Sequence, residues 1–218
     1  MELIVNLILS YLLGSISGSI LMGKLKGIDI REMGSGNAGG TNSFRTMGAT
    51  FALSVIFIDV LKGYIAVKFV PYLQLGDILT INTINTINIE LLHIICGTGV
   101  VLGHVYPIYH GFKGGKGAAT MVGVLAALFP VSLVICFILW IIILIFTGYV
   151  GFSTILAGII LPIITAFYFE EGLGSPFGIF TIIISLFIIF THRSNIQRML
   201  NGNENRFEKA MIFRKNTQ

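Results

Sequence analysis

Six long apolar runs, separated by short polar segments, constrain what this chain can fold into. The first run, residues 3–23, has 21 residues, and a helix of about 20 apolar residues crosses a hydrocarbon layer roughly 30 Å thick. The other runs span residues 50–70, 91–109, 118–146, 150–169 and 177–190. With 55% hydrophobic and 11% charged residues, the chain has more apolar surface than one soluble core can bury. We therefore expect an all-α, polytopic integral membrane helical bundle that forms one domain over residues 1–218.

The fourth apolar run is too long for one crossing and contains a proline. At about 1.5 Å per residue its 29 residues would make a helix of about 44 Å, and Pro130 lies near its middle. Because proline cannot continue the hydrogen bonding of a helix interior, we predict a break at Phe129 and Pro130. The products of this break are either two short helices or a re-entrant hairpin. The chain then has about seven transmembrane helices, or five together with the hairpin.

The distribution of charge predicts the orientation of the chain. Twelve of the 14 Lys and Arg residues lie at positions 24–45, 113–116 and 193–215, whereas Asp77, Glu90, Glu170 and Glu171 lie in the alternate segments. By the positive-inside rule the three basic segments share the cytoplasmic face, with the N-terminus outside and the C-terminus cytoplasmic.

One pair of charges lies inside an apolar run. Asp59 and Lys62, three residues apart in the run 50–70, can pair on one helix face. Charges at this depth are candidates for a function, and we expect this pair chiefly to support a polar centre.

The first of three polar segments with candidate functional residues, residues 34–49, reads GSGNAGGTNSFRTMGA. Its glycines match the spacing of a dinucleotide fingerprint, but no strand precedes them, so that interpretation fails. Its composition favours an oxyanion, because glycines let backbone N–H groups approach one and an arginine offers a planar pair of donors. The candidate residues are Ser35, Gly36, Asn37, Asn42 and Arg45.

The second polar segment, residues 103–120, reads GHVYPIYHGFKGGKGAAT. It is not a nucleotide-binding P-loop, because Gly117 stands where that motif requires the Ser or Thr that binds magnesium. A helix starting near Ala118 would direct the positive end of its dipole at an anion in the loop. We predict phosphate binding by Lys113, Gly114, Gly115 and Lys116, with His104 in a supporting role.

The third polar segment, residues 191–206, follows the last apolar run directly and reads HRSNIQRMLNGNENRF from position 192 onward. His192, Asn195 and Arg198 lie close to one face of the helix predicted here, with Glu204 near its end. A histidine beside phosphate loops is a candidate acid, base or hydrogen-bond donor.

Together the motifs GSGNxGxTN, GHxxPxxxxFKGGKGxAT and HRxNIxRxxxGxE, in this order between apolar runs, resemble the bacterial acyl-phosphate:glycerol-3-phosphate acyltransferases, the PlsY family. The resemblance implies a multi-pass enzyme of the bacterial plasma membrane, with its active site at the cytoplasmic face. It implies transfer of a fatty acyl group from acyl phosphate to the sn-1 hydroxyl of glycerol 3-phosphate, with membrane lipid as the other partner. It also implies that Ser35, Arg45, His192 and Asn195 act at the site, with Lys113 or Lys116. The resemblance further implies a hydroxyl at the site from Ser153 or Thr154.

The residues themselves are consistent with this chemistry. Acyl phosphate is already activated, so oriented donors could supply most of the rate without a metal or other cofactor. The base is either a substrate phosphate or His192. No feature indicates a nucleic acid or nucleotide partner. Two other classes remain open: a transporter of an organic phosphate, and a membrane phosphatase that uses water as the acceptor.

Overall fold

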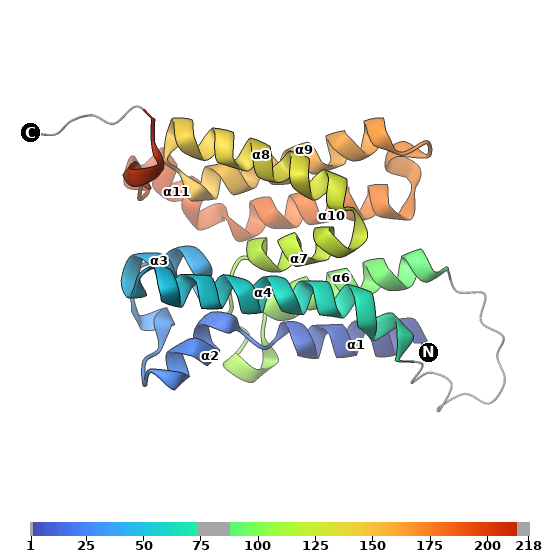
Figure 1. Ribbon diagram of the computed structural model, residues 1–218, viewed down its shortest axis with the longest axis horizontal. Helices are drawn as coiled ribbons and strands as arrows, with labels where there is room; N and C mark the ends of the chain where they lie inside the picture. Colours follow the sequence, from blue (N-terminus) through green and yellow to red (C-terminus); the bar gives the residue numbers. More distant parts are fainter. Residues whose placement is uncertain (1, 74–87, 213–218) are drawn as a thin grey trace, which may run out of the picture. The chain divides into compact units, whose positions relative to one another are not determined.

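The computed structural model of the protein describes residues 2–73 and 88–212, and every regular element in these ranges is helical (Figure 1). The chain divides into two compact units, Met1–Phe129 and Pro130–Gln218, and the division falls at the predicted break. A single domain over residues 1–218 stays a prediction. The first unit contains α1 (Glu2–Gly14), α2 (Gly18–Leu25), η1 (Ile30–Glu32), α3 (Gly40–Met47), α4 (Ala49–Phe69), η2 (Val70–Tyr72), α6 (Ile89–Val105), η3 (Ile108–His110) and α7 (Ala118–Leu128). The second contains α8 (Pro130–Thr147), α9 (Val150–Tyr168), η4 (Gly172–Gly174), α10 (Pro176–Thr191), α11 (Arg193–Leu200) and η5 (Glu208–Ala210).

The helices of the described residues have the lengths and composition of membrane spans. Five stretches are long and apolar enough to cross alone: Glu2–Leu25, Ala49–Tyr72, Ile89–His110, Pro130–Thr147 and Val150–Tyr168. A sixth forms if α10 and α11, bent by 52°, make one span, and α7 is a shorter apolar helix. The 11 residues of α7 reach about 16 Å, roughly half of a hydrocarbon layer. The all-helical membrane fold and the break at Pro130 are therefore confirmed, while the orientation of the termini stays a prediction.

Close glycine contacts hold the helices of the first unit together, with α1 packed along α6 and α4 along α7. A methyl group added at Gly103 would overlap the Tyr11 carbonyl oxygen, and one at Gly99 would lie 2.7 Å from that of Leu7. On the other pair, a methyl at Gly123 would overlap the carbonyl of Val60. Small residues allow membrane helices to approach this closely, since lipid provides no hydrophobic force between them.

The first apolar run is broken, whereas its sequence predicts one continuous helix. Helix α1 ends at Gly14 and α2 begins at Gly18, leaving three residues between them inside the candidate span Glu2–Leu25. Both flanking glycines are in close contact with neighbours, because an added methyl would overlap the Val100 carbonyl at Gly14 and lie 2.8 Å from the Val55 carbonyl at Gly18.

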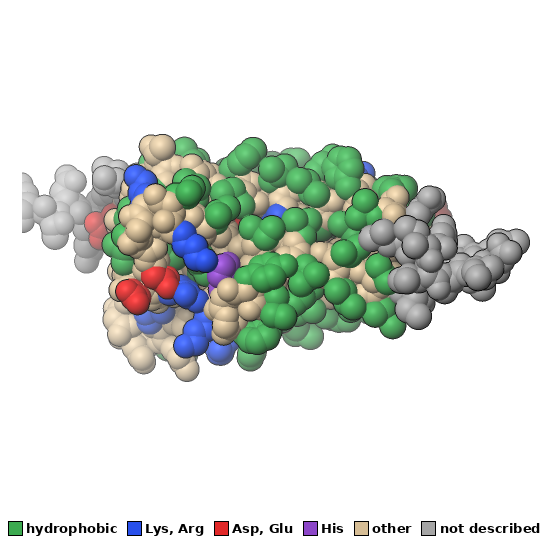
Figure 2. Space-filling view, turned by 90° about the horizontal axis from the view of Figure 1, so that it is seen from below, with side chains coloured by type: hydrophobic (Ala, Val, Ile, Leu, Met, Phe, Trp, Pro, Cys, Tyr) green, Lys and Arg blue, Asp and Glu red, His purple; other side chains and the backbone are tan. Residues whose placement is uncertain are grey.

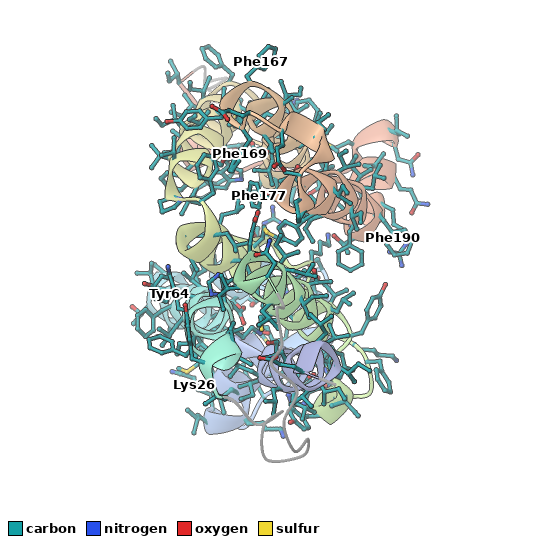
Figure 3. The ribbon with its side chains drawn as sticks, turned by 90° about the vertical axis from the view of Figure 1, so that its right-hand side faces the viewer. Lys26, Tyr64, Phe167, Phe169, Phe177 and Phe190 are labelled. Carbon is teal, nitrogen blue, oxygen red and sulfur yellow. The ribbon has the colours of Figure 1, made fainter. Side chains whose placement is uncertain are left out.

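In the second unit α9 packs against both α8 and α10. Aromatic rings close the turn between α9 and α10: Phe169 and Phe177 lie with ring centroids 5.3 Å apart, while Phe167 points outward and is 89% exposed (Figure 3). Helix α10 begins at Pro176 after Ser175, whose hydroxyl accepts the Gly178 N–H over 2.9 Å. A serine cap and a proline in the first turn are a strong start signal for a helix.

Candidate active site

The loop of the first polar segment is held by the buried side chain of Asn42 on α3. Its side-chain oxygen accepts hydrogen bonds from the Ser35 backbone N–H (2.9 Å) and hydroxyl (3.2 Å). Its amide nitrogen donates to the carbonyls of Ile30 (3.2 Å) and Met33 (2.9 Å). Gly34, at φ +58°, approaches so closely that an added methyl would overlap the Asn42 oxygen. Asn42 thus fixes the exposed Ser35 against α3.

The anion-binding chemistry of this segment lies in its side chains. The backbone N–H of Gly36 donates to the Met33 carbonyl over 3.0 Å, so this amide is already engaged. Arg45 is exposed on α3 one turn beyond Asn42, and Asn37 is half-buried. These side chains can bind an anion here, and the Ser35 hydroxyl can do so by rotating its proton from Asn42 to the anion.

The glycine loop, which we define as residues 111–117, caps the C-terminal end of α6. The last carbonyl groups of a helix have no partner within the helix. Here the N–H of Gly114 donates to the Val105 carbonyl and that of Gly115 to the His104 carbonyl, both over 3.1 Å. The expectation that these two amides hold a phosphate is therefore corrected: α6 already uses them. The charged groups of this loop are the exposed Lys113 and the half-buried Lys116.

Arg31 was not among the residues expected at the site, yet it links the chain just before the first polar segment to the second polar segment. Its guanidinium pairs with Asp29 at 2.6 Å and donates from Nη1 to the His110 carbonyl over 3.0 Å. The hydrogen bond from the Arg31 side chain lowers the pKa of Asp29 to about 2, and the pairing raises the pKa of Arg31. An aspartate two residues before an arginine is the signal that could have indicated this pair.

Three buried polar side chains, two from α4 and one from α6, contact one another near the C-terminal end of α6. Lys62 Nζ is 3.0 Å from Asp59 Oδ1, so the pairing expected on α4 is present. His104 joins them from α6, with its Nδ1 2.9 Å from the Lys62 nitrogen and 3.4 Å from Asp59 Oδ1. All three residues are buried.

Charged side chains of the first unit gather at one end of the face drawn in Figure 2. Most of the blue, red and purple side chains lie toward the end at which Figure 1 places α2 and α3, and green hydrophobic side chains cover most of the rest. Lys24 and Lys26, at the C-terminal end of α2, and Lys113 of the glycine loop are all exposed. The distribution suits a membrane protein whose polar chemistry is confined to one end of its helices.

In the second unit, His192 lies at the bend between α10 and α11. Its Nδ1 is 2.8 Å from the Ile188 carbonyl oxygen, which can only accept, so Nδ1 carries a proton. The lone pair of the neutral ring is then on Nε2. The side chain can therefore accept a proton in its neutral form and donate one in its charged form.

Asn195 on α11 is held between a carboxylate and a glycine. Its amide nitrogen donates to Glu204 Oε1 over 2.9 Å, and Arg198 Nε donates to Glu204 Oε2 over 2.6 Å. A methyl added at Gly151 would lie 2.6 Å from the Asn195 nitrogen. The structure thus brings together three residues predicted from the third segment, and Gly151 is a further neighbour that the sequence did not indicate.

The two candidate hydroxyls on α9 differ in their hydrogen bonding. Thr154 donates to the Val150 carbonyl over 2.9 Å and accepts the indole N–H of Trp140 over 3.1 Å. Ser153 donates to the Tyr149 carbonyl over 2.9 Å and is fully buried. Ser153 therefore keeps more acceptor capacity than Thr154.

Comparisons with known proteins agree on one family. A family model described as glycerol-3-phosphate acyltransferase matches residues 4–202. Curated relatives named glycerol-3-phosphate acyltransferase include that of Chlorobium phaeobacteroides, 39% identical over 95% of this chain and 97% of the relative. That of Chlorobaculum parvum is 41% identical over 90% of this chain and 93% of the relative.

Two solved structures are similar over nearly the whole chain. Both are crystal structures of PlsY (YgiH), an integral membrane glycerol 3-phosphate acyltransferase. Its glycerol 3-phosphate form has a TM-score of 0.78 at 35% identity, covering 95% of this chain and 96% of that one. Its lysophosphatidic acid form has a TM-score of 0.76 at 34% identity, covering 94% and 95%.

Proposed function

The chain belongs to the glycerol-3-phosphate acyltransferase family of integral membrane enzymes, and we propose that it transfers a fatty acyl group from acyl phosphate to the sn-1 hydroxyl of glycerol 3-phosphate. The products are lysophosphatidate and inorganic phosphate, and the step is the first acylation of phospholipid synthesis. The observation that carries this proposal is the similarity to a protein crystallised in a glycerol 3-phosphate form and a lysophosphatidic acid form. These two molecules are the acceptor and the product of such a transfer.

We assign the binding of phosphate to the basic side chains of the polar segments. Lys113 and Lys116 of the glycine loop and Arg45 of α3 supply positive charge, and charge-assisted hydrogen bonds to phosphate are the stronger kind. Ser35, held by Asn42, offers a positioned hydroxyl. Asn37 and Asn195 can add neutral donors, whereas the Gly36 amide is engaged with Met33. Ser153 and Thr154 both donate to backbone carbonyls, so either could accept from a substrate hydroxyl, and Ser153 has more spare acceptor capacity for this.

The reaction needs positioning and charge more than it needs acid catalysis. The acceptor hydroxyl oxygen attacks the carbonyl carbon of acyl phosphate, a carbon–oxygen ester bond forms, and the bond from that carbon to the phosphate oxygen breaks. Negative charge develops on the carbonyl oxygen and stays on the departing phosphate, so fixed donors stabilise both. The hydroxyl proton passes to a phosphate dianion of the substrates or to the Nε2 lone pair of His192. We favour the phosphate, because its second pKa lies near 6 and it lies beside the reacting hydroxyl.

Reconstitution with defined substrates tests this function. Purified protein in lipid vesicles is given labelled glycerol 3-phosphate together with acyl phosphate, acyl-CoA or no donor. We expect labelled 1-acyl lysophosphatidate only in the reaction whose donor is acyl phosphate. Production with acyl-CoA only would contradict the proposed donor, and release of free fatty acid without lysophosphatidate would indicate a phosphatase. Uptake of glycerol 3-phosphate into the vesicles without any product would indicate a transporter.

We infer a location in the bacterial plasma membrane from the family, whose relatives include bacterial glycerol-3-phosphate acyltransferases and an integral membrane enzyme. We infer from the charge distribution that the polar segments lie at the cytoplasmic face, because twelve of the 14 basic residues lie in segments predicted to share that side.

A further inference from the structure

The break in the first apolar run exposes backbone groups at membrane depth. Residues Ser15, Ile16 and Ser17 separate α1 from α2. The C-terminal carbonyls of α1 and the first N–H groups of α2 consequently lack helical partners. In a hydrocarbon layer each unsatisfied backbone group costs several kcal/mol, so a break there persists only where other groups satisfy it.

Two side chains of α4 form hydrogen bonds to backbone groups on the two sides of this break. Lys62 Nζ donates to the carbonyls of Gly14 (2.9 Å) and Ile16 (2.7 Å), and Asp59 Oδ1 accepts the Gly18 N–H over 3.2 Å. The ammonium lies at the negative end of α1 and the carboxylate at the positive end of α2, so each charge matches the helix dipole that it faces. The ion pair thus bridges the break from one helix.

Burying two charges to hold a helix in place costs desolvation free energy. Asp59 Oδ2 is buried and has no hydrogen-bond partner among the described residues. Four groups lie within 3.0 Å of the Lys62 nitrogen, which has three N–H bonds: two carbonyls, Asp59 and His104. Buried ion pairs can often be replaced by apolar residues of similar volume without loss of stability. Apolar residues could not replace this pair in the same way, because its hydrogen bonds to backbone groups of the break also fix the geometry of the break.

His104 connects the ion pair to the glycine loop. Its Nδ1 contacts both members of the ion pair, while a methyl added at Gly115 would overlap its Nε2 and lie 2.8 Å from the Ala38 carbonyl. The ring is therefore packed between the ion pair and the loop. The break also contacts the segment between α6 and the glycine loop, because the Ser15 hydroxyl accepts the Ile108 N–H over 3.3 Å.

We propose that Asp59, Lys62 and His104 form a positioning clamp that holds the broken first helix and the glycine loop in one arrangement. Lys62 and Asp59 fix the break and the orientation of the His104 ring, and the ring fixes the loop that carries Lys113 and Lys116. The clamp residues do not contact the substrate; they set where the two lysines lie. The expected consequence for affinity rests on the proposed function, in which these lysines bind phosphate.

Hydrogen exchange measured without substrate tests the clamp independently of that function. The variants are Lys62→Met, which keeps a long unbranched side chain, and His104→Gln. The control is Val67→Ala, a fully buried position on the same helix as Lys62. We expect the Gly114 and Gly115 amides to exchange at least tenfold faster in both clamp variants than in wild-type protein. In the control, compared at a loss of melting temperature similar to that of the clamp variants, these amides should exchange at the wild-type rate. Equal protection of these amides in all four proteins would overturn the clamp.

Binding of glycerol 3-phosphate, measured calorimetrically without an acyl donor, gives the functional readout. We expect its Kd to rise about tenfold in the clamp variants and to stay unchanged in the control. If the loop amides lose protection but wild-type protein does not bind glycerol 3-phosphate, the clamp stands and the assigned substrate fails. If Lys62→Met does not fold, His104→Gln decides. Should that variant also fail, Gly115→Ala displaces the same ring from the loop side, and unchanged affinity in it would overturn the proposal.

Discussion

The side-chain amide of Asn195 donates to Glu204 Oε1 over 2.9 Å, and both residues are buried. The other carboxylate oxygen accepts from Arg198 at 2.6 Å, so Glu204 orients Asn195 from a segment that follows α11. Glu204→Ala should lower the melting temperature markedly, because a charge-assisted hydrogen bond contributes roughly 1.5–3 kcal/mol and its loss strands buried donors. Glu204→Gln, which keeps one acceptor oxygen, should retain more stability. The exposed Glu171→Ala is the control, and equal melting temperatures for all three variants would contradict this prediction.

Gly114→Ala tests the loop at the end of α6. A methyl there would overlap the His104 carbonyl and lie 2.7 Å from Pro107 Cδ, so the loop must move away from α6. We expect a raised KM for one phosphate substrate, of about tenfold, with kcat changed much less. Gly174→Ala is the matched control, since nothing lies within 4 Å of an added methyl there. Wild-type kinetics in Gly114→Ala would mean that the loop position has no part in substrate binding.

His192→Gln separates a base from a binding group. If His192 removes the hydroxyl proton, the Gln variant should lose on the order of a hundredfold to ten-thousandfold in kcat with little change in binding. We expect instead that Gln keeps much more activity than Ala, and that its pH profile keeps an acidic limb near pH 6 from phosphate ionisation. An inactive Gln variant without that limb would make His192 the base.

The pair Asp29 and Arg31 predicts an acid-dependent part of stability. The pKa of Asp29 is lowered to about 2 in the folded protein, chiefly by the hydrogen bond from Arg31, whereas an unfolded aspartate titrates near 3.9. A carboxyl with a lowered folded pKa stabilises the protein above its unfolded pKa, and this contribution is lost as the pH falls from about 4 through 2. Wild-type protein should therefore lose more melting temperature between pH 6 and pH 3 than Asp29→Asn. Glu32→Gln should behave as wild type, and an identical pH response of Asp29→Asn and wild type would exclude the link.

Single cysteines labelled from outside intact cells test the orientation. We expect Glu171→Cys to react with an impermeant reagent, and Ser35→Cys and Lys113→Cys to react only after the cells are opened. The two natural cysteines are buried and free, which keeps the background low. Labelling of Lys113→Cys from outside would reverse the proposed topology. The companion site Asp77 lies outside the described residues.

Much of the fold could be predicted from the sequence because it depends on local composition. Apolar runs of membrane length require helices, and the proline in the fourth run requires a break whatever the partners of that run are. The family motifs are likewise short local strings, so the resemblance to a family depends on the order of residues alone. The pairing of Asp59 with Lys62 follows from three-residue spacing on one helix.

What the sequence determined by itself, then, is where helices form, which charges cluster, and which family the motifs resemble. Only the tertiary structure decided how backbone groups are used: the Gly114 and Gly115 amides cap α6, and the first apolar run breaks at Gly14. Neither could be predicted, because hydropathy does not record which carbonyls lack a partner or which lysine from another helix supplies one. Hydrogen bonds between segments far apart in the chain settle such choices, and they exist only once the helices have packed.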